Sequence, residues 1–364
     1  MSAAGLSAKP DQTVLPVQYL RAAAAFAVVL FHISVLSQET WGLDPARVDH
    51  VGAAGVDLFF VISGFIMAMI VDRGGAFDGR QFMIRRVARV APAYWAITLF
   101  VFMLALAVPS LFRSTEASLG HLLVSLAFLP VDVGSGSAGP LLVVGWTLNY
   151  EVFFYALVAL TAGLFGDRRL IGTAAVLLGL VAMGMVVAPD HATADFYTDP
   201  ILLEFVFGIL IFRSWRRRRI EPGFGAAAAF LVGLALLALQ WERPLDEWRA
   251  FYWGVPAAAV LYGGLGALRF SSRILALLGD WSYALYLTHI FVVTFYIRFA
   301  ISSDYGPDVS WPVHYLIILA GCVGLAAMFY YCVERPLSRW TLSQLQRRFL
   351  PPAEPSTIVA ERAG

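Results

Sequence analysis

The chain has 364 residues, of which 59% are apolar and only 14% are charged. Ordinary soluble domains contain roughly 45–50% apolar and about 25% charged residues. A mean hydropathy of +0.73 is also far above what a water-soluble core of this size needs. These values exclude a soluble enzyme, a disordered scaffold and a disulfide-stapled secreted domain. They predict an all-α polytopic membrane protein.

Ten apolar stretches are long enough for an α-helical span, which needs about 20 residues. The short run 119–130 is expected to form an interfacial or re-entrant helix, and an eleventh span is the alternative. Residues 1–14 then form an N-terminal tail, 15–341 the membrane domain, and 342–364 a polar tail that is expected to be disordered. The predicted spans are 15–37, 54–72, 92–111, 146–166, 170–188, 200–214, 223–240, 251–269, 278–300 and 313–334.

The distribution of basic residues predicts the orientation of this bundle. Apart from Lys9, every basic residue is an arginine. Cytoplasmic loops of membrane proteins carry an excess of such residues. With both termini in the cytoplasm, twenty basic residues lie inside and four outside, two more being within spans. An eleventh span would move Arg216–Arg219 outside, so ten spans with both termini cytoplasmic are favoured.

The first span carries two ionisable side chains in an otherwise apolar, alanine-rich helix. Arg21 and His32 are eleven residues apart, which places them on one helix face. They are separated by about 16 Å along the axis, with Arg21 toward the cytoplasm. Ionisable groups at membrane depth are costly and therefore mark functional sites by default. A snorkelling arginine and a hydrogen-bonded core histidine are the structural alternative.

Two acids fall at about the depth of His32 in the outer half of their spans. Asp57 lies near the start of the second span and Glu151 in the fourth. All three side chains could meet in one layer, where a carboxylate orients the imidazole for general acid–base chemistry. The alternatives are an N-cap role for Asp57 and a structural arginine pair for Glu151. No spacing resembles a metal-ligand motif, so no metal is expected.

A cluster of arginines precedes Pro92 in what we expect to be a cytoplasmic loop. Arg85, Arg86 and Arg89 could hold the phosphates of a donor substrate. Positive-inside orientation and lipid headgroup contact explain such clusters equally well. The run Arg216–Arg219 is interpreted as a topology signal alone.

The ninth predicted span concentrates polar groups in the sequence GDWSYALYLTHIF. They could line a polar substrate channel, or they could join helices by hydrogen bonds. Glu334 and Pro336 are expected to end the last span at the cytoplasmic face, and a pairing of Glu334 with the cytoplasmic arginines is the alternative. The polar residues of the ninth span are Ser282, Tyr283, Tyr286 and His289.

Taken together in order, these segments resemble the acyltransferase-3 family of integral membrane acyltransferases, and most closely its exopolysaccharide O-acetyltransferase branch. The resemblance covers about residues 15 to 340. The matching pieces are Arg21 with His32, Gly55 to Phe60 followed by Ser63-Gly64-Phe65, Arg85-Arg86 with Arg89, Trp146-Thr147-Leu148 with Glu151, Ser282-Tyr283 with Tyr286 and His289, and Glu334 with Pro336.

The resemblance implies ten transmembrane helices in the bacterial inner membrane. It implies transfer of an acyl group, usually acetyl from acetyl-CoA, to a hydroxyl of a cell-surface glycan or its lipid-linked precursor. Arg21 and His32 would be the essential pair, with Asp57 and Glu151 as acidic partners and Arg85, Arg86 and Arg89 on the donor side.

Two departures from the family pattern affect this expectation. Many relatives carry a second acid directly after the glutamate, whereas here Val152 occupies that position. Many also carry an extracytoplasmic esterase-like domain, for which this chain has no room. The membrane domain itself is therefore expected to complete the transfer.

In the expected mechanism, coenzyme A phosphates bind the donor-side arginines and the thioester arm extends inward past Arg21. His32, oriented by Asp57 or Glu151, deprotonates the acceptor hydroxyl; an acyl-histidine intermediate is the less favoured route. The expected partners are membrane lipid, acyl-CoA and a glycan, without nucleic acid, and a homo-oligomer is left open. The rival functions are a glycan or lipid transporter or flippase with a proton relay, an accessory subunit of polysaccharide export, and an acyltransferase for a macrolide, a lipid or a peptidoglycan sugar.

Overall fold

The computed structural model describes residues 14–41, 49–72, 77–111, 118–131, 139–240, 248–300 and 310–350. Within these ranges the chain is helical and contains no β-strand. The α-helices are α1 (Leu15–Trp41), α2 (Asp49–Val71), α3 (Gly79–Ala107), α4 (Leu119–Leu126), α5 (Trp146–Phe165), α6 (Arg169–Val187), α7 (Ala192–Thr198), α8 (Leu203–Arg217), α9 (Phe224–Ala238), α10 (Val255–Ala267), α11 (Arg273–Phe295), α12 (Trp311–Phe329) and α13 (Arg335–Phe349).

Each predicted span falls on one of these helices, in the same order along the chain. In the described ranges, six helical stretches are long and apolar enough to cross a membrane. One of them, Val143–Val187, contains both α5 and α6, while α8, α9 and α10 are shorter than the usual span. The predicted short helix at 119–130 is α4, which has only eight residues. The six stretches are Leu15–Glu39, Val51–Val71, Gly79–Ala107, Val143–Val187, Arg273–Arg298 and Trp311–Phe349.

Helix α3 begins 13 residues before the predicted span, because Asp78 caps it. The Asp78 carboxylate accepts hydrogen bonds from the backbone N–H groups of Arg80 (2.9 Å) and Gln81 (3.1 Å). Pro92 lies inside the helix and does not begin it. The expectation of a loop before Pro92 is therefore wrong: the clustered arginines have fixed positions on a helix.

The last span also continues further than predicted. A π-helical turn, η7 (Tyr330–Glu334), joins α12 directly to α13. Pro336 occupies the first turn of α13, where its missing N–H costs little. Glu334 and Pro336 therefore do not stop the helix, and α13 extends to Phe349, within the segment expected to be disordered. Residues 1–13 and 351–364 lie outside the described ranges.

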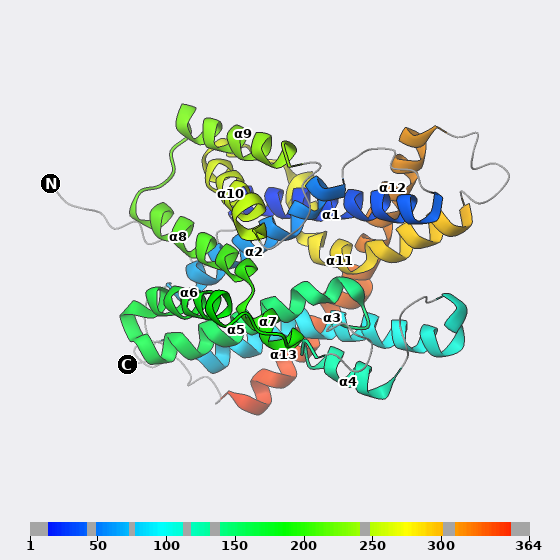
Figure 1. Cartoon of the computed structure of the whole chain (residues 1–364), viewed down its shortest axis with the longest axis horizontal. Helices are drawn as coiled ribbons and strands as arrows, with labels where there is room; N and C mark the ends of the chain where they lie inside the picture. Colours follow the sequence, from blue (N-terminus) through cyan, green and yellow to red (C-terminus); the bar gives the residue numbers. More distant parts are fainter. Residues whose placement is uncertain are drawn as a thin grey trace, which may run out of the picture.

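The helices pack around a central group formed by α1, α2 and α11. Helix α1 packs against both α2 and α11, α2 packs against α8, and α11 against α12. Figure 1 shows α5, α6 and α7 on one side of the molecule and α9 and α10 on the opposite side. The helices that supply the predicted site residues, α1, α2, α3, α5 and α11, thus lie in contact near the centre.

The contact between α2 and α8 is unusually close because both helices present glycine. A Cβ atom on Gly64 would lie 2.2 Å from the carbonyl oxygen of Phe205, and one on Gly208 would lie 2.1 Å from that of Val61. Small residues allow helix backbones in a membrane to approach in this way. The close approach fixes α2, and with it Asp57 and Ser63, against α8.

Candidate active site

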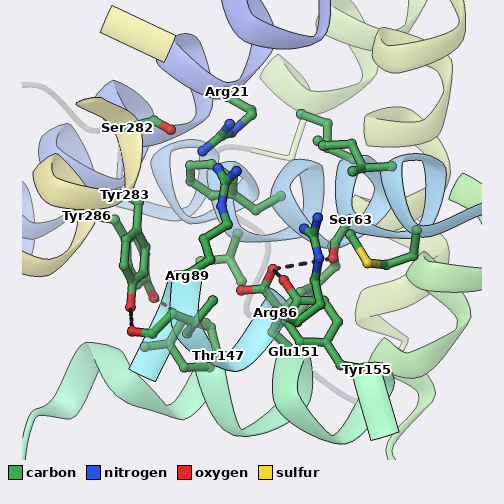
Figure 2. A pocket seen from close by; sticks show the side chains of 18 of the residues that line it. Arg21, Ser63, Arg86, Arg89, Thr147, Glu151, Tyr155, Ser282, Tyr283 and Tyr286 are labelled. Carbon is green, nitrogen blue, oxygen red and sulfur yellow. Dashed lines mark hydrogen bonds between the residues drawn. The ribbon is translucent and has the colours of Figure 1, made fainter. Parts of the chain in front are cut away.

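A cavity of about 270 Å³ lies between five helices, α1, α2, α3, α5 and α11 (Figure 2). Its wall combines apolar side chains from α2, such as Phe59 and Met67, with polar and charged groups from the other four helices. The cavity brings together many of the predicted site residues, although they lie as far as 265 positions apart in the sequence. The polar and charged lining residues are Arg21, Ser63, Arg86, Arg89, Thr147, Glu151, Tyr155, Ser282, Tyr283 and Tyr286.

Three guanidinium groups, those of Arg21, Arg86 and Arg89, line this cavity. In the described part of the chain, none of them forms an ion pair with a carboxylate. Arg21 donates to the side-chain oxygen of Gln18 (3.1 Å), and Gln18 in turn donates to Asp280 (2.8 Å). This chain of hydrogen bonds holds Arg21 in place without neutralising it.

Arg85 is separated from the other two arginines of its cluster. Its side chain is exposed and does not line the cavity, whereas Arg86 and Arg89 do. Position 89 is within one helical turn of both 85 and 86, so it neighbours both, but of these two only Arg86 reaches the cavity. Figure 2 shows Arg89 and Arg21 pointing toward each other across the cavity, with Arg86 beside Tyr155.

Among the described residues, Glu151 is the one carboxylate in the lining, and it accepts hydrogen bonds from two hydroxyl groups. Tyr155, one helical turn further along α5, donates to it, and Ser63 on α2 donates over 3.4 Å. With three arginines and one glutamate, the cavity carries an excess of positive charge. That charge favours an anionic occupant.

The residues of α11 divide into two groups. Ser282, Tyr283 and Tyr286 line the cavity, as predicted for a substrate channel, but His289 does not. The Tyr283 hydroxyl donates to the carbonyl oxygen of Val90 (2.8 Å), near Pro92. The Tyr286 hydroxyl lies 2.8 Å from both the Thr147 hydroxyl and the Val144 carbonyl oxygen, at the far side of the cavity from Arg86.

His289 instead contacts His32. The Nε2 atom of His289 lies 3.2 Å from Nδ1 of His32, and the two ring centroids are 4.8 Å apart. His289 is fully buried (0% exposed), while His32 is partly exposed. The partner of the His32 imidazole is thus a second imidazole, and the expected carboxylate partner is not observed.

His32 also does not line the arginine cavity. Phe59 and Tyr286 line it and pack against each other, with ring centroids 5.9 Å apart, and Tyr286 packs against His289 at 6.1 Å. Tyr286 therefore contacts both the cavity and His289, and together with Phe59 it forms an aromatic layer on this wall of the cavity.

Asp57 is fully buried (0% exposed) and forms a bidentate ion pair with Arg249. Two hydrogen bonds of 2.9 Å join the guanidinium Nε and Nη2 atoms to the two carboxylate oxygens. Arg249 directly precedes a π-helical turn, η5 (Ala250–Gly254), that packs against α2. His32, Asp57 and Glu151 thus have different partners and do not form one catalytic group.

The sequence did not predict three residues in or near the site, namely Arg249, Glu204 and Tyr155. Glu204 is fully buried in the first turn of α8, and neither of its carboxylate oxygens has a hydrogen-bond partner in the described ranges. An acid inside an apolar span and the Glu151–Tyr155 spacing of one helical turn were visible signals. The pairing of Arg249 with Asp57, 192 residues away, had no local signal. No group of three potential metal ligands occurs among the described residues.

Comparison with known proteins identifies the family of this assembly. An acyltransferase domain family, that of the acyltransferase-3 proteins, matches residues 16–331. The chain belongs to the acyltransferase-3 family. This membership confirms the resemblance seen in the sequence, and it identifies the chain as a membrane O-acyltransferase.

Three relatives represent the range of similarity. The exopolysaccharide production protein ExoZ of Rhizobium meliloti is 38% identical, over 79% of this chain and 90% of its own length. The acyltransferase MdmB of Streptomyces mycarofaciens is 27% identical, over 88% of this chain and 90% of its own length. A Staphylococcus aureus protein provisionally named an O-acetyltransferase is 24% identical, over 90% of this chain but only 58% of its own length. No solved structure matches the chain at a significant level.

Proposed function

We propose that this protein transfers an acetyl group from acetyl-CoA, bound from the cytoplasm, to a hydroxyl of an exported polysaccharide or its lipid-linked precursor. The enzyme would do so within the bacterial inner membrane, as a bundle of ten transmembrane helices with both termini in the cytoplasm. The similarity to the exopolysaccharide production protein of Rhizobium meliloti supports a polysaccharide acceptor.

The observation that carries the donor assignment is the group of three unpaired guanidinium groups in one cavity. A charge that is partly removed from water and has no carboxylate partner is costly, so a cavity lined by such charges is stabilised by a bound anion. Coenzyme A supplies phosphate groups, which match the hydrogen-bonding fork of arginine. Arg86 and Arg89, in the first half of α3, would bind these phosphates, and Arg21 would face the arm that follows them.

The size of the cavity supports binding of only part of the donor inside it. At about 270 Å³ it lies below the usual range of roughly 300–1,000 Å³ for sites that enclose a drug-sized ligand. We therefore assign the interior to the acyl group and its pantetheine arm. The nucleotide portion would remain at the mouth, beside Arg89, whose side chain is exposed.

The proposed reaction needs one base and one proton donor. His32 takes the proton of the acceptor hydroxyl, and the hydroxyl oxygen attacks the thioester carbonyl carbon. The carbon–sulfur bond then breaks, the acyl ester forms, and the leaving thiolate of coenzyme A takes the proton from the His32 imidazolium. In this proposal the thioester passes the aromatic layer formed by Phe59 and Tyr286 to reach His32.

Glu151 has a different role in this proposal from the one its position in the sequence suggested. The hydrogen bond that it accepts from Ser63 joins α5 to α2, and the one that it accepts from Tyr155 lies within α5. Glu151 offsets one of the three positive charges and leaves the net charge of the lining positive. We propose that Glu151 positions the cavity wall and balances its charge, and that it does not act as the base.

The test is a transfer assay on membranes that contain the protein. Radiolabelled acetyl-CoA is added with the polysaccharide acceptor of the host, and the label is followed into ester-linked acetyl groups that mild alkali releases. His32→Ala should abolish the transfer while the protein level and its thermal unfolding remain as in the wild type. His314→Ala is the matched control, since His314 is a buried histidine of α12 that pairs with Tyr296.

Each outcome decides between the proposal and its rivals. Label in the glycan that depends on His32 supports an acetyltransferase with a polysaccharide acceptor. Label found only in lipid or in a small macrolide would overturn the acceptor assignment. Glycan movement across the membrane without consumption of acetyl-CoA would instead identify a transporter.

A further inference from the structure

We propose that His289 is a positioning residue that fixes the tautomer of His32 and leaves Nε2 of His32 as the basic nitrogen. This inference rests on the proposed role of His32 as the base. It assigns to His289 a function that differs from the channel-lining role expected from its sequence position. The argument follows from which atoms surround the two imidazole rings.

The first step concerns the proton on His289. Its Nδ1 atom lies 2.8 Å from the carbonyl oxygen of Tyr286 and 3.1 Å from that of Leu285. Carbonyl oxygens accept hydrogen bonds and never donate them, so Nδ1 of His289 must carry a hydrogen. A charged imidazolium would be costly at this fully buried position. The neutral ring therefore has a free lone pair on Nε2.

The second step concerns the proton on His32, which faces the lone pair on Nε2 of His289. Its Nδ1 atom lies 3.2 Å from the lone pair of His289 Nε2 and 2.9 Å from the carbonyl oxygen of Val28. Both neighbours are acceptors, so Nδ1 of His32 must be the donor to both. In a neutral imidazole only one nitrogen carries hydrogen, and Nε2 of His32 is consequently unprotonated.

The third step concerns access to that nitrogen. In the described residues, Nε2 of His32 forms no hydrogen bond, and it is not among the buried polar atoms that lack a partner. It is therefore open to an incoming group. The side chain as a whole is only partly exposed, so the open edge of the ring is the one that carries Nε2.

In this arrangement the neutral His289 imidazole occupies the position that a carboxylate has in a catalytic triad. In a serine hydrolase, a carboxylate accepts the Nδ1 hydrogen of the histidine, sets its tautomer and stabilises the imidazolium. Here the acceptors are an imidazole nitrogen and a backbone carbonyl. When His32 takes a proton on Nε2, its Nδ1–H donates more strongly to both, because hydrogen bonds from a charged donor are stronger.

The tautomer can be measured directly, without any activity assay. Protein labelled with ring-¹⁵N histidine is reconstituted in lipid bilayers, and the six histidines are observed by solid-state NMR. Protonated and unprotonated ring nitrogens have well-separated ¹⁵N shifts, and the signals missing from His32→Gln belong to His32. We expect a neutral His32 with Nδ1 protonated and Nε2 unprotonated. A neutral His32 protonated on Nε2 would overturn the inference, whatever the enzyme acylates.

Kinetics of two His289 variants supply the second measurement. His289→Leu removes the acceptor and keeps an apolar side chain, whereas His289→Gln can place an amide oxygen near the former Nε2 atom. We expect kcat of the leucine variant to fall about 100-fold, in the range of one acid–base contribution, with KM for acetyl-CoA unchanged. The glutamine variant should recover activity to within about tenfold of the wild type.

The outcomes separate this inference from the proposed function. If His32→Ala is inactive while both His289 variants keep wild-type kcat, the base assignment stands and the positioning role is wrong. If the His289 variants raise KM alone, His289 contributes to binding, and the inference is also overturned. Should His289→Leu fail to fold, the tautomer of the wild-type protein and the kcat of His289→Gln still decide the question.

Discussion

Two groups of arginine in this protein differ in whether a carboxylate pairs with them. Arg249 is held by Asp57 through two hydrogen bonds of 2.9 Å, so its charge is neutralised within the fold. Arg21, Arg86 and Arg89 line a cavity and have no carboxylate ion pair in the described ranges. The first arrangement has its counter-charge within the fold, while we propose that an anionic substrate supplies it in the second. The presence of a partner, more than burial, distinguishes a structural arginine from a binding one.

Breaking the ion pair between Asp57 and Arg249 should have the largest effect on the stability of the folded protein. Asp57→Ala leaves Arg249 charged and unpaired in the interior, which costs about 3–5 kcal/mol for a buried pair. We expect loss of folded protein in membranes, measured by fluorescence-detected size-exclusion chromatography after mild detergent extraction. The double variant Asp57→Leu with Arg249→Met removes both charges and should restore folding. Failure of the double variant to do so would show that the pair contributes more than charge balance.

Removing a positive charge from the cavity should weaken binding of the donor without destabilising the protein, in contrast to Asp57→Ala. Arg86→Gln is expected to raise KM for acetyl-CoA by about 10- to 100-fold, the value of one hydrogen bond between charged groups. The melting temperature should stay the same or rise, because an unpaired charge has been removed. Arg85→Gln is the matched control on the neighbouring, exposed position of α3. Equal changes in KM for the two variants would contradict the assignment of the cavity to the donor.

The aromatic layer formed by Phe59 and Tyr286 provides a smaller test. Phe59→Trp adds volume beside Tyr286, where the two rings already lie 5.9 Å apart. We expect kcat to fall about tenfold through misplacement of the thioester, with KM for acetyl-CoA little changed. Phe59→Leu opens the layer and should keep kcat within a few-fold of the wild type. A lower kcat in the leucine variant alone would show that the layer is not a barrier.

The smallest expected effect is on the pH dependence of stability, through Asp199, which lies outside the predicted spans. Burial raises the pKa of its carboxyl group above the ordinary range, although its hydrogen bond from the Ile201 N–H and the nearby Arg249 guanidinium oppose this shift. The protonated form is therefore favoured in the folded state, and that contribution to stability is lost as the pH rises above the usual range for aspartate. Asp199→Asn should stabilise the protein at pH 7 by at most about 1 kcal/mol. Thermal unfolding at pH 4.5 and pH 7 would show a smaller pH dependence in the variant, and an unchanged dependence would contradict this account.

The sequence predicted the helices well because each one is defined by a local property. An apolar run of about 20 residues predicts a membrane helix wherever it occurs, and every predicted span coincides with an observed helix. The boundaries were less accurate at the caps: Asp78 begins α3 early, and the π-helical turn before Pro336 lets the last helix continue. Both differences come from backbone hydrogen bonding, which hydropathy does not report.

The partners of the site residues were harder to predict, because they depend on contacts between distant helices. Glu151 lines one cavity with Arg21, although the sequence placed it at the depth of His32 in the outer half of the span. His32 and Asp57 are polar positions within predicted spans, but each has a partner more than 190 residues away, His289 and Arg249. Both partners were visible as residues in the sequence. No pattern within a single helix connected them to His32 or Asp57.

The most direct test of the central claim is the binding of coenzyme A to the purified protein in lipid nanodiscs, measured by isothermal titration calorimetry. The account predicts that the wild type and Arg85→Gln bind with the same affinity. Arg86→Gln and Arg89→Gln should each bind at least about tenfold more weakly, since each loses a hydrogen bond to phosphate. Identical affinities for all four proteins would contradict the claim that the unpaired arginines of the cavity bind the donor.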